Sequence, residues 1–191
     1  MGHISDHGPV LLLLATFSQQ TAALRWAREQ ATLAWGPVAL ESPEFDFTET
    51  DYYHATMGSP LTKTFYAFEQ LVDPSVLADR KLQTNQWERT YAEIVRDRAL
   101  DALPVRPLNL DPGYVTSAKL VLASTKDHAH RIYIGQGIYA ELTLQYRKRT
   151  WQTLDWTYPD YRRRDYGEFF TLCREYLRGR AKEEGKSGIV E

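Results

Sequence analysis

Runs and alternations of apolar residues predict the strands of this chain. Residues 10–17 form an unbroken apolar run of strand length, which favours a buried central strand. Residues 64–72 place apolar side chains on both alternating sets of positions and also predict a strand. Residues 38–47 alternate weakly around Pro43, so they predict an edge strand or an extended loop. A further short strand is expected over residues 105–110.

Helical spacing of apolar residues predicts four helices: from Ser18 or Thr21 to Trp35, from Asp73 to about Arg98, from about Thr116 to Ser124, and from Asp165 to about Glu184. Asp73 is expected to cap the second helix, because its carboxylate can accept hydrogen bonds from free backbone amides and Pro74 fits the first turn. Residues 51–60 are rich in turn formers and predict a loop, whereas residues 151–161 are aromatic and irregular.

A β-hairpin is predicted around Gly135-Gln-Gly137. A three-residue turn there pairs Arg131 directly with Glu141 across the two strands. Period-two alternation then assigns one face to the core, with Ile132, Ile134, Ile138, Ala140, Leu142 and Leu144. The opposite face carries Arg131, Tyr133, Tyr139, Glu141 and Thr143.

The order of the elements predicts the fold class. Strand, helix, strand, strand, helix, strand is the order of a ferredoxin-like βαββαβ core, so we expect an α+β fold. A helix, the β-hairpin and a C-terminal helix extend that core. We expect residues 1–8 to form a flexible arm, residues 9–184 a single α+β domain, and residues 185–191 a flexible tail.

Composition and charge add a few constraints. The 191 residues are 43% hydrophobic and 25% charged with a net charge of −2, so no overall attraction to nucleic acid or anionic membranes is expected. Basic runs at residues 147–149 and 162–164 are interpreted as solvated surface. Cys173, the only cysteine, is expected to be a buried core residue. The apolar run at residues 10–15 is too short for a signal or a membrane span, so a cytoplasmic location is expected.

Short motifs of polar and aromatic residues are spread along most of the chain. They are Asp51-Tyr-Tyr53 with Met57-Gly58, Phe68-Glu69, Lys81 with Thr84-Asn85 and Glu88, Asn109-Leu-Asp-Pro-Gly-Tyr114, Leu120-Val-Leu-Ala-Ser-Thr-Lys126, His130-Arg-Ile-Tyr133 and Trp156-Thr-Tyr-Pro-Asp-Tyr161. In combination, from about Pro9 to Tyr161, they resemble the bacterial family called domain of unknown function 4416. The resemblance implies no reaction, because none is established for that family. No Gly-x-x-x-x-Gly-Lys-Ser/Thr segment is present in the sequence, so a GTPase is not predicted.

Ionisable residues on the second helix and the hairpin suggest a charged cleft. Lys81, Asn85 and Glu88 fall on one stripe of that helix. If the stripe meets the polar face of the hairpin, it forms a cleft with the Arg131–Glu141 pair. Glu88 and Glu141 are then candidate catalytic carboxylates. The alternative is a solvated helix surface and a half-exposed ion pair of little energetic consequence.

The segment that follows Leu110 suggests anion binding. Asp111-Pro-Gly-Tyr114 precedes the helix predicted over residues 116–124, whose N-terminal amides could hold an anion. Lys126 and Arg131 follow within a short distance along the chain. The alternative is that Asp111 itself caps those amides in an ordinary turn.

Two histidines raise the question of a metal site. His128 and His130 would project to the same face of a strand, as a pair of metal ligands would. Asp111 or Asp127 could complete such a site only through the tertiary fold. We interpret the histidines as the start of a strand and predict no metal ligands.

The aromatic segment over residues 151–161 has several interpretations. Its rings and the neighbouring arginines could stack single-stranded nucleic acid. A lid packed over the core, or a surface that docks a protein partner, explains the same residues. Nucleic acid is therefore not expected as a partner.

The sequence supports two hypotheses of function. In the first, the chain binds a small anionic or phosphorylated ligand in a charged cleft, and Glu88 and Glu141 are available for acid–base catalysis. The ligand-binding residues are then Lys81, Asn85, Asp111, Lys126 and Arg131. In the second, the chain is a non-catalytic protein-interaction module that uses residues 151–161. Enzymatic activity, cofactors and oligomeric state are left open.

Overall fold

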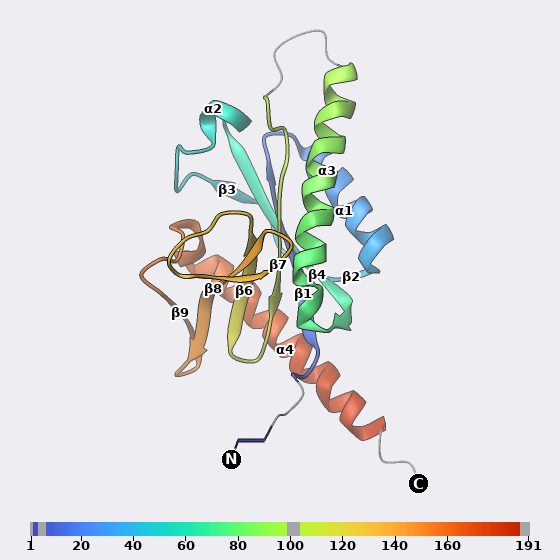
Figure 1. Ribbon diagram of the computed structural model, residues 1–191, viewed down its shortest axis with the longest axis vertical. Helices are drawn as coiled ribbons and strands as arrows, with labels where there is room; N and C mark the ends of the chain where they lie inside the picture. The colour runs from blue at the N-terminus through green and yellow to red at the C-terminus, as the bar shows by residue number, and fades with distance from the viewer. Residues whose placement is uncertain (1, 4–6, 99–103, 188–191) are drawn as a thin grey trace.

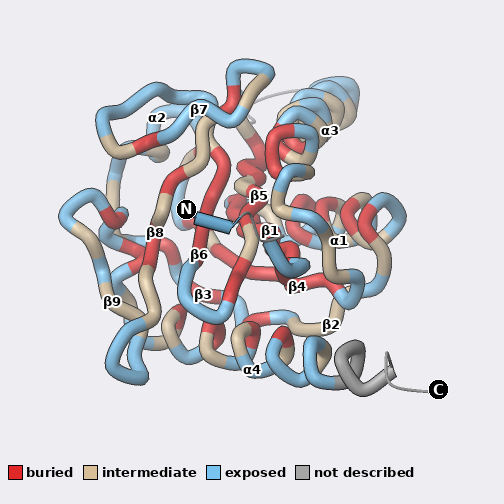
Figure 2. Tube along the Cα trace, turned by 60° about the horizontal axis from the view of Figure 1, so that its bottom comes forward, coloured by how far each residue is buried: buried red, intermediate tan, exposed pale blue. Residues whose placement is uncertain are grey.

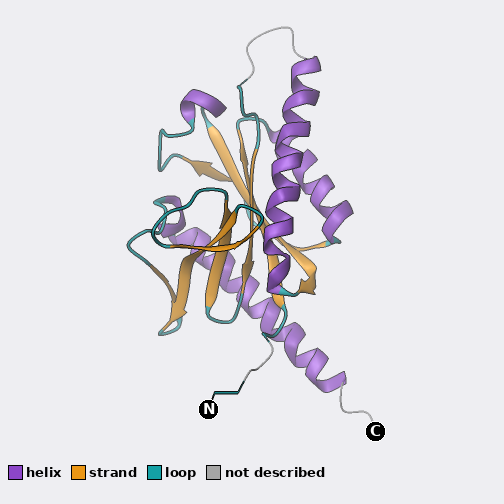
Figure 3. Cartoon of the chain, viewed as in Figure 1, coloured by secondary structure: helices purple, strands orange, loops and turns teal. Residues whose placement is uncertain are grey.

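In the computed structural model, the chain folds into a nine-stranded antiparallel sheet with helices on both faces (Figure 1, Figure 3). The structure describes residues 2–3, 7–98 and 104–187. The strands are β1 (Val10–Ser18), β2 (Val38–Glu41), β3 (Phe45–Phe47), β4 (Leu61–Val72), β5 (Asn109–Val115), β6 (Lys119–Ser124), β7 (Arg131–Gly135), β8 (Ile138–Arg147) and β9 (Thr150–Thr153). The helices are α1 (Thr21–Trp35), α2 (His54–Met57), α3 (Leu77–Arg98) and α4 (Arg164–Ser187), with short 3-10 turns at Pro74–Val76 and Asp160–Arg162.

The strands lie in the order β2-β4-β1-β5-β6-β8-β7, while β3 pairs with β4 and β9 pairs with β8. Helices α1 and α3 pack on one face of the sheet and α4 packs on the other. In Figure 2 the buried middle strands lie between these two layers of helix. The sheet is therefore covered on both sides.

Strand β1 shows why residues 10–17 are continuously apolar. Leu12 and Leu14 pack towards α1, whereas Leu11 and Leu13 pack towards α4. Every residue of β1 is buried. A strand that is buried on both faces has no position for an exposed polar side chain, so its sequence loses the usual alternation. Each buried leucine contributes about 2 kcal/mol of hydrophobic stabilisation.

Several local predictions are confirmed. Asp73 accepts a hydrogen bond from the backbone N–H of Ser75 at 2.8 Å, and Pro74 begins the turn that leads into α3. In β4, Phe65 packs on the α4 side and Phe68 on the α1 side. Cys173 of α4 is fully buried in the core, as expected.

The fold class is α+β, as the sequence predicts, but the sheet is larger than expected. Strand β6 replaces a predicted helix, and β9 forms within a segment that we expected to be irregular. The short helix α2 lies in the predicted loop over residues 51–60. This larger sheet does not by itself establish a ferredoxin-like topology.

The helix predicted over residues 116–124 is wrong, because residues 119–124 form strand β6. The hydroxyl oxygen of Thr116 accepts hydrogen bonds from the amides of Ala118 and Lys119 in a tight turn, and β6 then returns alongside β5. Leu120 and Val121 pack on opposite faces of the sheet. A short apolar run fits a buried strand as well as a helix, and here pairing with two neighbouring strands decides between them.

The pairing of Arg131 with Glu141 is confirmed, but the predicted core face of the hairpin is only partly confirmed. On β8, Ile138 is buried and Ala140 and Leu142 pack against the same cluster, whereas the prediction fails on β7. Arg131 pairs with Glu141, and both are buried, whereas Ile132 is 73% exposed and Ile134 is 37% exposed. Strand β7 is at the edge of the sheet, and the face that carries Ile132 and Ile134 is open to solvent. The other face, which holds the ion pair, is covered by the segment that follows β9.

An irregularity in strand pairing also changes the alternation along β8. The register shifts between the pairs Leu120–Leu144 and Val121–Leu142. Leu142 therefore packs on the α3 side and Leu144 on the α4 side. A bulge inserts one extra residue and reverses the faces beyond it, which a strict two-residue period cannot anticipate.

The ends of several elements also differ from expectation. The strand predicted over residues 105–110 begins at Asn109 and continues to Val115, so Asp111-Pro-Gly113 lies within a strand and not in a turn. Helix α4 continues through Ser187, into the predicted tail. The remainder of that tail, and residues 1 and 4–6 of the predicted N-terminal arm, lie outside the described residues. Among the described helices, none has the length and apolar character needed to cross a membrane.

Candidate functional site

A cavity of about 700 Å³ lies where strands β5 and β6 cease to pair. The two strands are paired only through Gly113, Tyr114 and Val115 of β5. They approach so closely at Gly113 that a Cβ atom there would lie 2.4 Å from the carbonyl oxygen of Val121, which requires glycine. The first half of β5 and the last residues of β6 are unpaired with each other and border the cavity.

All seven site residues proposed from the sequence line this one cavity. They are Lys81, Asn85, Glu88, Asp111, Lys126, Arg131 and Glu141. Helix α3 supplies the first three from one side of the sheet, and the strands and the segment after β6 supply the others. The alternative of a solvated helix stripe is wrong, since Lys81 is only 5% exposed. The roles of these residues stay predictions.

Asp111 is held in a network of hydrogen bonds at one wall of the cavity. Lys81 Nζ donates to Asp111 Oδ1 at 2.9 Å and to the Leu110 carbonyl at 2.8 Å. Asn109 Nδ2 donates to Asp111 Oδ2 at 2.7 Å, and Arg106 Nη2 donates to Asn109 Oδ1 at 2.5 Å. Burial favours the neutral acid, but the positive charge and hydrogen bond of Lys81 prevail and hold the pKa of Asp111 below its usual range. Because Asp111 is in a strand, the proposed anion site at a helix N-terminus does not exist.

Glu88 lies beside this network, and its pKa is shifted in the opposite direction to that of Asp111. Its Oε1 accepts a hydrogen bond from the Leu110 amide at 2.7 Å, and its Oε2 is 3.6 Å from Arg106 Nη2. Burial raises the pKa of Glu88, and the negative charge of Asp111 adds to that rise against the opposing charge of Lys81. Two neighbouring carboxyl groups with opposite pKa shifts are the arrangement that acid–base chemistry uses.

Glu88→Gln is expected to change how stability depends on pH. A carboxyl group whose pKa is raised in the folded state stabilises the fold fully below its unfolded pKa of 4.5, and this contribution is lost as the pH rises through the folded pKa. The wild-type protein should therefore lose stability relative to Glu88→Gln as the pH rises from about 4.5 to neutrality, by about 1.4 kcal/mol for each unit of the shift. Urea denaturation across this range measures the difference. Glu93→Gln, at an exposed position on the same helix, is the control. If the stability difference between the wild type and Glu88→Gln did not change with pH, the raised pKa of Glu88 would be contradicted.

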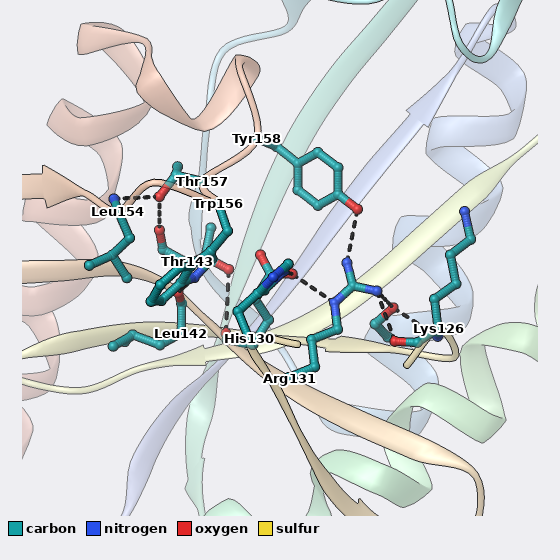
Figure 4. Close-up of polar contacts among 11 residues, drawn as sticks. Lys126, His130, Arg131, Leu142, Thr143, Leu154, Trp156, Thr157 and Tyr158 are labelled. Carbon is teal, nitrogen blue, oxygen red and sulfur yellow. Dashed lines mark hydrogen bonds and ion pairs between the residues drawn. The ribbon is translucent and has the colours of Figure 1, made fainter. Parts of the chain in front are cut away.

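Arg131 and Glu141 form a buried ion pair in another part of the cavity lining. Figure 4 shows Arg131 and its contact with Tyr158. Arg131 Nε donates to Glu141 Oε2 at 2.8 Å, and both side chains are 3% exposed. The Arg131 guanidinium also donates to Ser124 Oγ, to the Lys126 carbonyl and to the Tyr158 hydroxyl. The expectation of a half-exposed pair is therefore wrong. With most of its donors engaged, Arg131 fixes the positions of its neighbours.

Residues 154–162, called the roof loop below, cover this wall of the cavity. The indole N–H of Trp156 donates to the Leu142 carbonyl at 2.8 Å, and the Trp156 ring stacks on His130 at 5.4 Å between centroids. Thr157 Oγ1 donates to the Thr143 carbonyl at 2.7 Å (Figure 4). The polar atoms of the loop thus fasten it to β8, although Trp156 itself is 38% exposed.

A second buried ion pair fastens the end of the roof loop. Lys63 Nζ of β4 lies 2.5 Å from Asp160 Oδ2, and both residues are buried. Five aromatic rings surround the ammonium group, the nearest being that of Tyr161 at 4.2 Å from its centroid. Both residues line the cavity, and the sequence reasoning missed them. The only local signal was a lysine close to the apolar residues 65–68 of the same strand.

Lys126 lies at the mouth of the cavity and differs from the other basic residues there. Its Nζ donates to the Tyr52 hydroxyl at 3.1 Å, but it forms no ion pair with a carboxylate of the described residues. That hydrogen bond and the positive charge lower the pKa of Tyr52. The basic side chains that line the cavity are Lys63, Lys81, Arg106, Lys126 and Arg131, and the acidic ones are Glu88, Asp111, Glu141 and Asp160. Five against four leaves one positive charge in excess, and Lys126 carries it.

The two histidines differ in their surroundings. His130 Nε2 lies 3.1 Å from Glu141 Oε2 and its ring is covered by Trp156, while His128 lines the cavity. Within residues 2–3, 7–98 and 104–187, no group of three or more His, Cys, Asp or Glu side chains is placed to hold a metal ion.

Comparison with known proteins identifies a family whose function is unknown. Searches against curated proteins and against solved structures gave no match. A family model described as "Domain of unknown function (DUF4416)" matches residues 8–176, which include every residue that lines the cavity. The chain therefore belongs to the DUF4416 family, as its motifs suggest.

Proposed function

We propose that this cavity binds a small anionic or phosphorylated ligand. The volume of about 700 Å³ falls in the range of small-molecule sites, roughly 300–1,000 Å³. Its lining combines aromatic faces with nine charged side chains, which is unusual for a space that serves only packing. The observation that carries the proposal is Lys126, a cation in the lining of this space whose hydrogen-bond partner is a tyrosine hydroxyl and which has no carboxylate partner among the described residues.

The other residues would then have distinct tasks. Lys81 and Asp111 balance each other's charge and offer polar atoms beside Asn85. Arg131 is a positioning residue, because its guanidinium holds Glu141, Ser124 and Tyr158. Glu88 is our candidate for proton transfer, since its pKa is raised beside the ionised Asp111, and Glu141 is the second candidate.

The roof loop is less suited to docking a protein. An interaction surface needs aromatic residues that are free to pack against a partner. Trp156 and Tyr158 instead place their polar atoms on Leu142 and Arg131. We therefore favour the roof loop as a cover of the ligand cavity over the alternative of a non-catalytic interaction module.

Lys126→Ala is expected to weaken the binding of a phosphorylated ligand about five- to tenfold, the effect of losing one charge-assisted hydrogen bond. A thermal-shift screen of nucleotides and sugar phosphates identifies the ligand, and calorimetry measures the loss. Lys119→Ala is the matched control, because this exposed lysine of β6 does not line the cavity. Equal binding by both variants and the wild-type protein would contradict the proposal.

We also propose that a ferredoxin-like core underlies the larger sheet. What supports this is that β2, β4, β1 and β5 are consecutive antiparallel neighbours, and that α1 and α3 pack on the same face of them. The cytoplasmic location expected from the sequence stays a prediction.

A further inference from the structure

We infer that the wall of the cavity beneath the roof loop is a subsite for ligand hydroxyl groups, so that the anionic ligand is a sugar phosphate or a related polyol phosphate. This inference rests on the proposed function and adds the chemical class of the ligand. It is carried by two buried oxygen atoms that lack hydrogen-bond partners, one on Glu141 and one on Tyr161.

The two oxygens of Glu141 have different surroundings. Oε2 lies 2.8 Å from Arg131 Nε and 3.1 Å from His130 Nε2. Oε1 has no hydrogen-bond partner among the described residues, although Glu141 is only 2% exposed. A buried carboxylate oxygen without a donor is unfavourable, because it has lost its hydration without gaining a hydrogen bond. A donor on a ligand in the cavity would remove that cost.

Tyr161 adds a buried hydroxyl group that also lacks a hydrogen-bond partner among the described residues. The residue lines the cavity. The Tyr161 ring is held in the core by Phe170, stacked at 6.1 Å, and by Phe65 at 5.9 Å, so the position of the hydroxyl is set by packing. Burial raises the pKa of Tyr161 well above its usual value, so the group stays protonated and can both donate and accept.

Charge balance favours hydroxyl groups over amines as the ligand's donors. The negative charge of Glu141 is already matched by Arg131 at 2.8 Å. A ligand ammonium at Oε1 would lie close to that guanidinium and be repelled by it, whereas a neutral hydroxyl would not. Since Lys126 at the mouth favours an anion, the cavity combines an anion-binding end with a neutral hydrogen-bonding wall.

Aromatic side chains supply the apolar surface that a sugar ring requires. Those that line the cavity are Phe17, Phe47, Tyr52, Tyr53, Tyr158 and Tyr161. Ring faces accommodate the C–H groups of a sugar, while its hydroxyl groups need polar partners. This cavity offers both.

Calorimetric titration of three purified proteins tests the inference. The proteins are the wild type, Tyr161→Phe and Tyr166→Phe. Tyr166 is a matched control because its hydroxyl is also buried and without a partner in the described residues, but the residue does not line the cavity. The probes are glucose 6-phosphate, ribose 5-phosphate and glycerol 3-phosphate, with hexyl phosphate and inorganic phosphate as ligands that lack hydroxyl groups on carbon.

We expect at least one of the three polyol phosphates to bind more tightly than hexyl phosphate. Tyr161→Phe should weaken that binding about tenfold, as for one lost hydrogen bond, and leave hexyl phosphate unaffected. Tyr166→Phe should change neither. Equal affinity for hexyl phosphate and all polyol phosphates, or equal effects of the two substitutions, overturns the hydroxyl subsite and leaves the proposed function standing. If no phosphate compound binds, the proposed function fails and this inference fails with it.

Discussion

Asp160→Ala is expected to lower the free energy of unfolding by about 3–5 kcal/mol, because it leaves the buried ammonium of Lys63 without its counter-ion. The side chains of the pair are 3% and 7% exposed, so the ammonium gains little hydration in place of the lost carboxylate. The nearest aromatic ring attracts the ammonium by about 2 kcal/mol when desolvated, which does not replace a carboxylate in direct contact. Urea denaturation followed by tryptophan fluorescence measures the change.

Two further variants make this measurement specific. Asp155→Ala removes an exposed carboxylate from the same roof loop and should change stability by less than about 0.5 kcal/mol. The double variant Lys63→Met/Asp160→Leu removes both charges and should be more stable than Asp160→Ala alone. If Asp160→Ala lowered the free energy of unfolding by less than about 1 kcal/mol, the pair would contribute no more than a solvent-exposed ion pair does.

Arg131→Met is expected to destabilise the protein to a similar extent, about 3–5 kcal/mol, because it leaves the buried Glu141 carboxylate with only the His130 ring as a partner. It also removes the hydrogen bonds that connect Ser124, Lys126 and Tyr158 to the guanidinium. The same denaturation experiment measures the effect in the absence of ligand.

An exposed ion pair provides the comparison for Arg131→Met. Arg164 and Glu168 lie one helical turn apart on α4, with side chains 94% and 65% exposed. Arg164→Met should therefore cost less than about 0.5 kcal/mol. If the two arginine variants were equally stable, burial of the Arg131–Glu141 pair would have no energetic consequence, and Arg131 could not be the residue that holds this wall of the cavity together.

The sequence predicted the elements whose signals are local. The apolar run of β1, the Asp73 cap and the Arg131–Glu141 register follow from spacing alone, and each agrees with the structure. The helix expected over residues 116–124 failed because a run of consecutive apolar residues suits a strand covered on both faces equally well. The sequence of this segment alone does not show whether other elements cover it on one face or on both.

The sequence predicted which residues line the candidate site better than it predicted how they are arranged there. Lys81, Asn85 and Glu88 were found because helical spacing places them on one stripe, and the structure brings that stripe to the cavity. The polar face of the hairpin was taken as the exposed one, because the alternation gives no sign that a later loop covers it. Lys63 and Asp160 were missed because they meet across 97 residues of sequence. Such a pairing is a property of the tertiary fold.

The close approach of β5 and β6 at Gly113 has a consequence for how this family could diversify. Backbone atoms of two strands approach closely where the sheet divides, so the point of division does not depend on the charged side chains that line the space beyond it. Relatives could therefore exchange residues on α3 or the roof loop and recognise different molecules while the division of the sheet stays in place. A glycine at this position would then be a better marker of a shared cavity than any of the charged residues inside it.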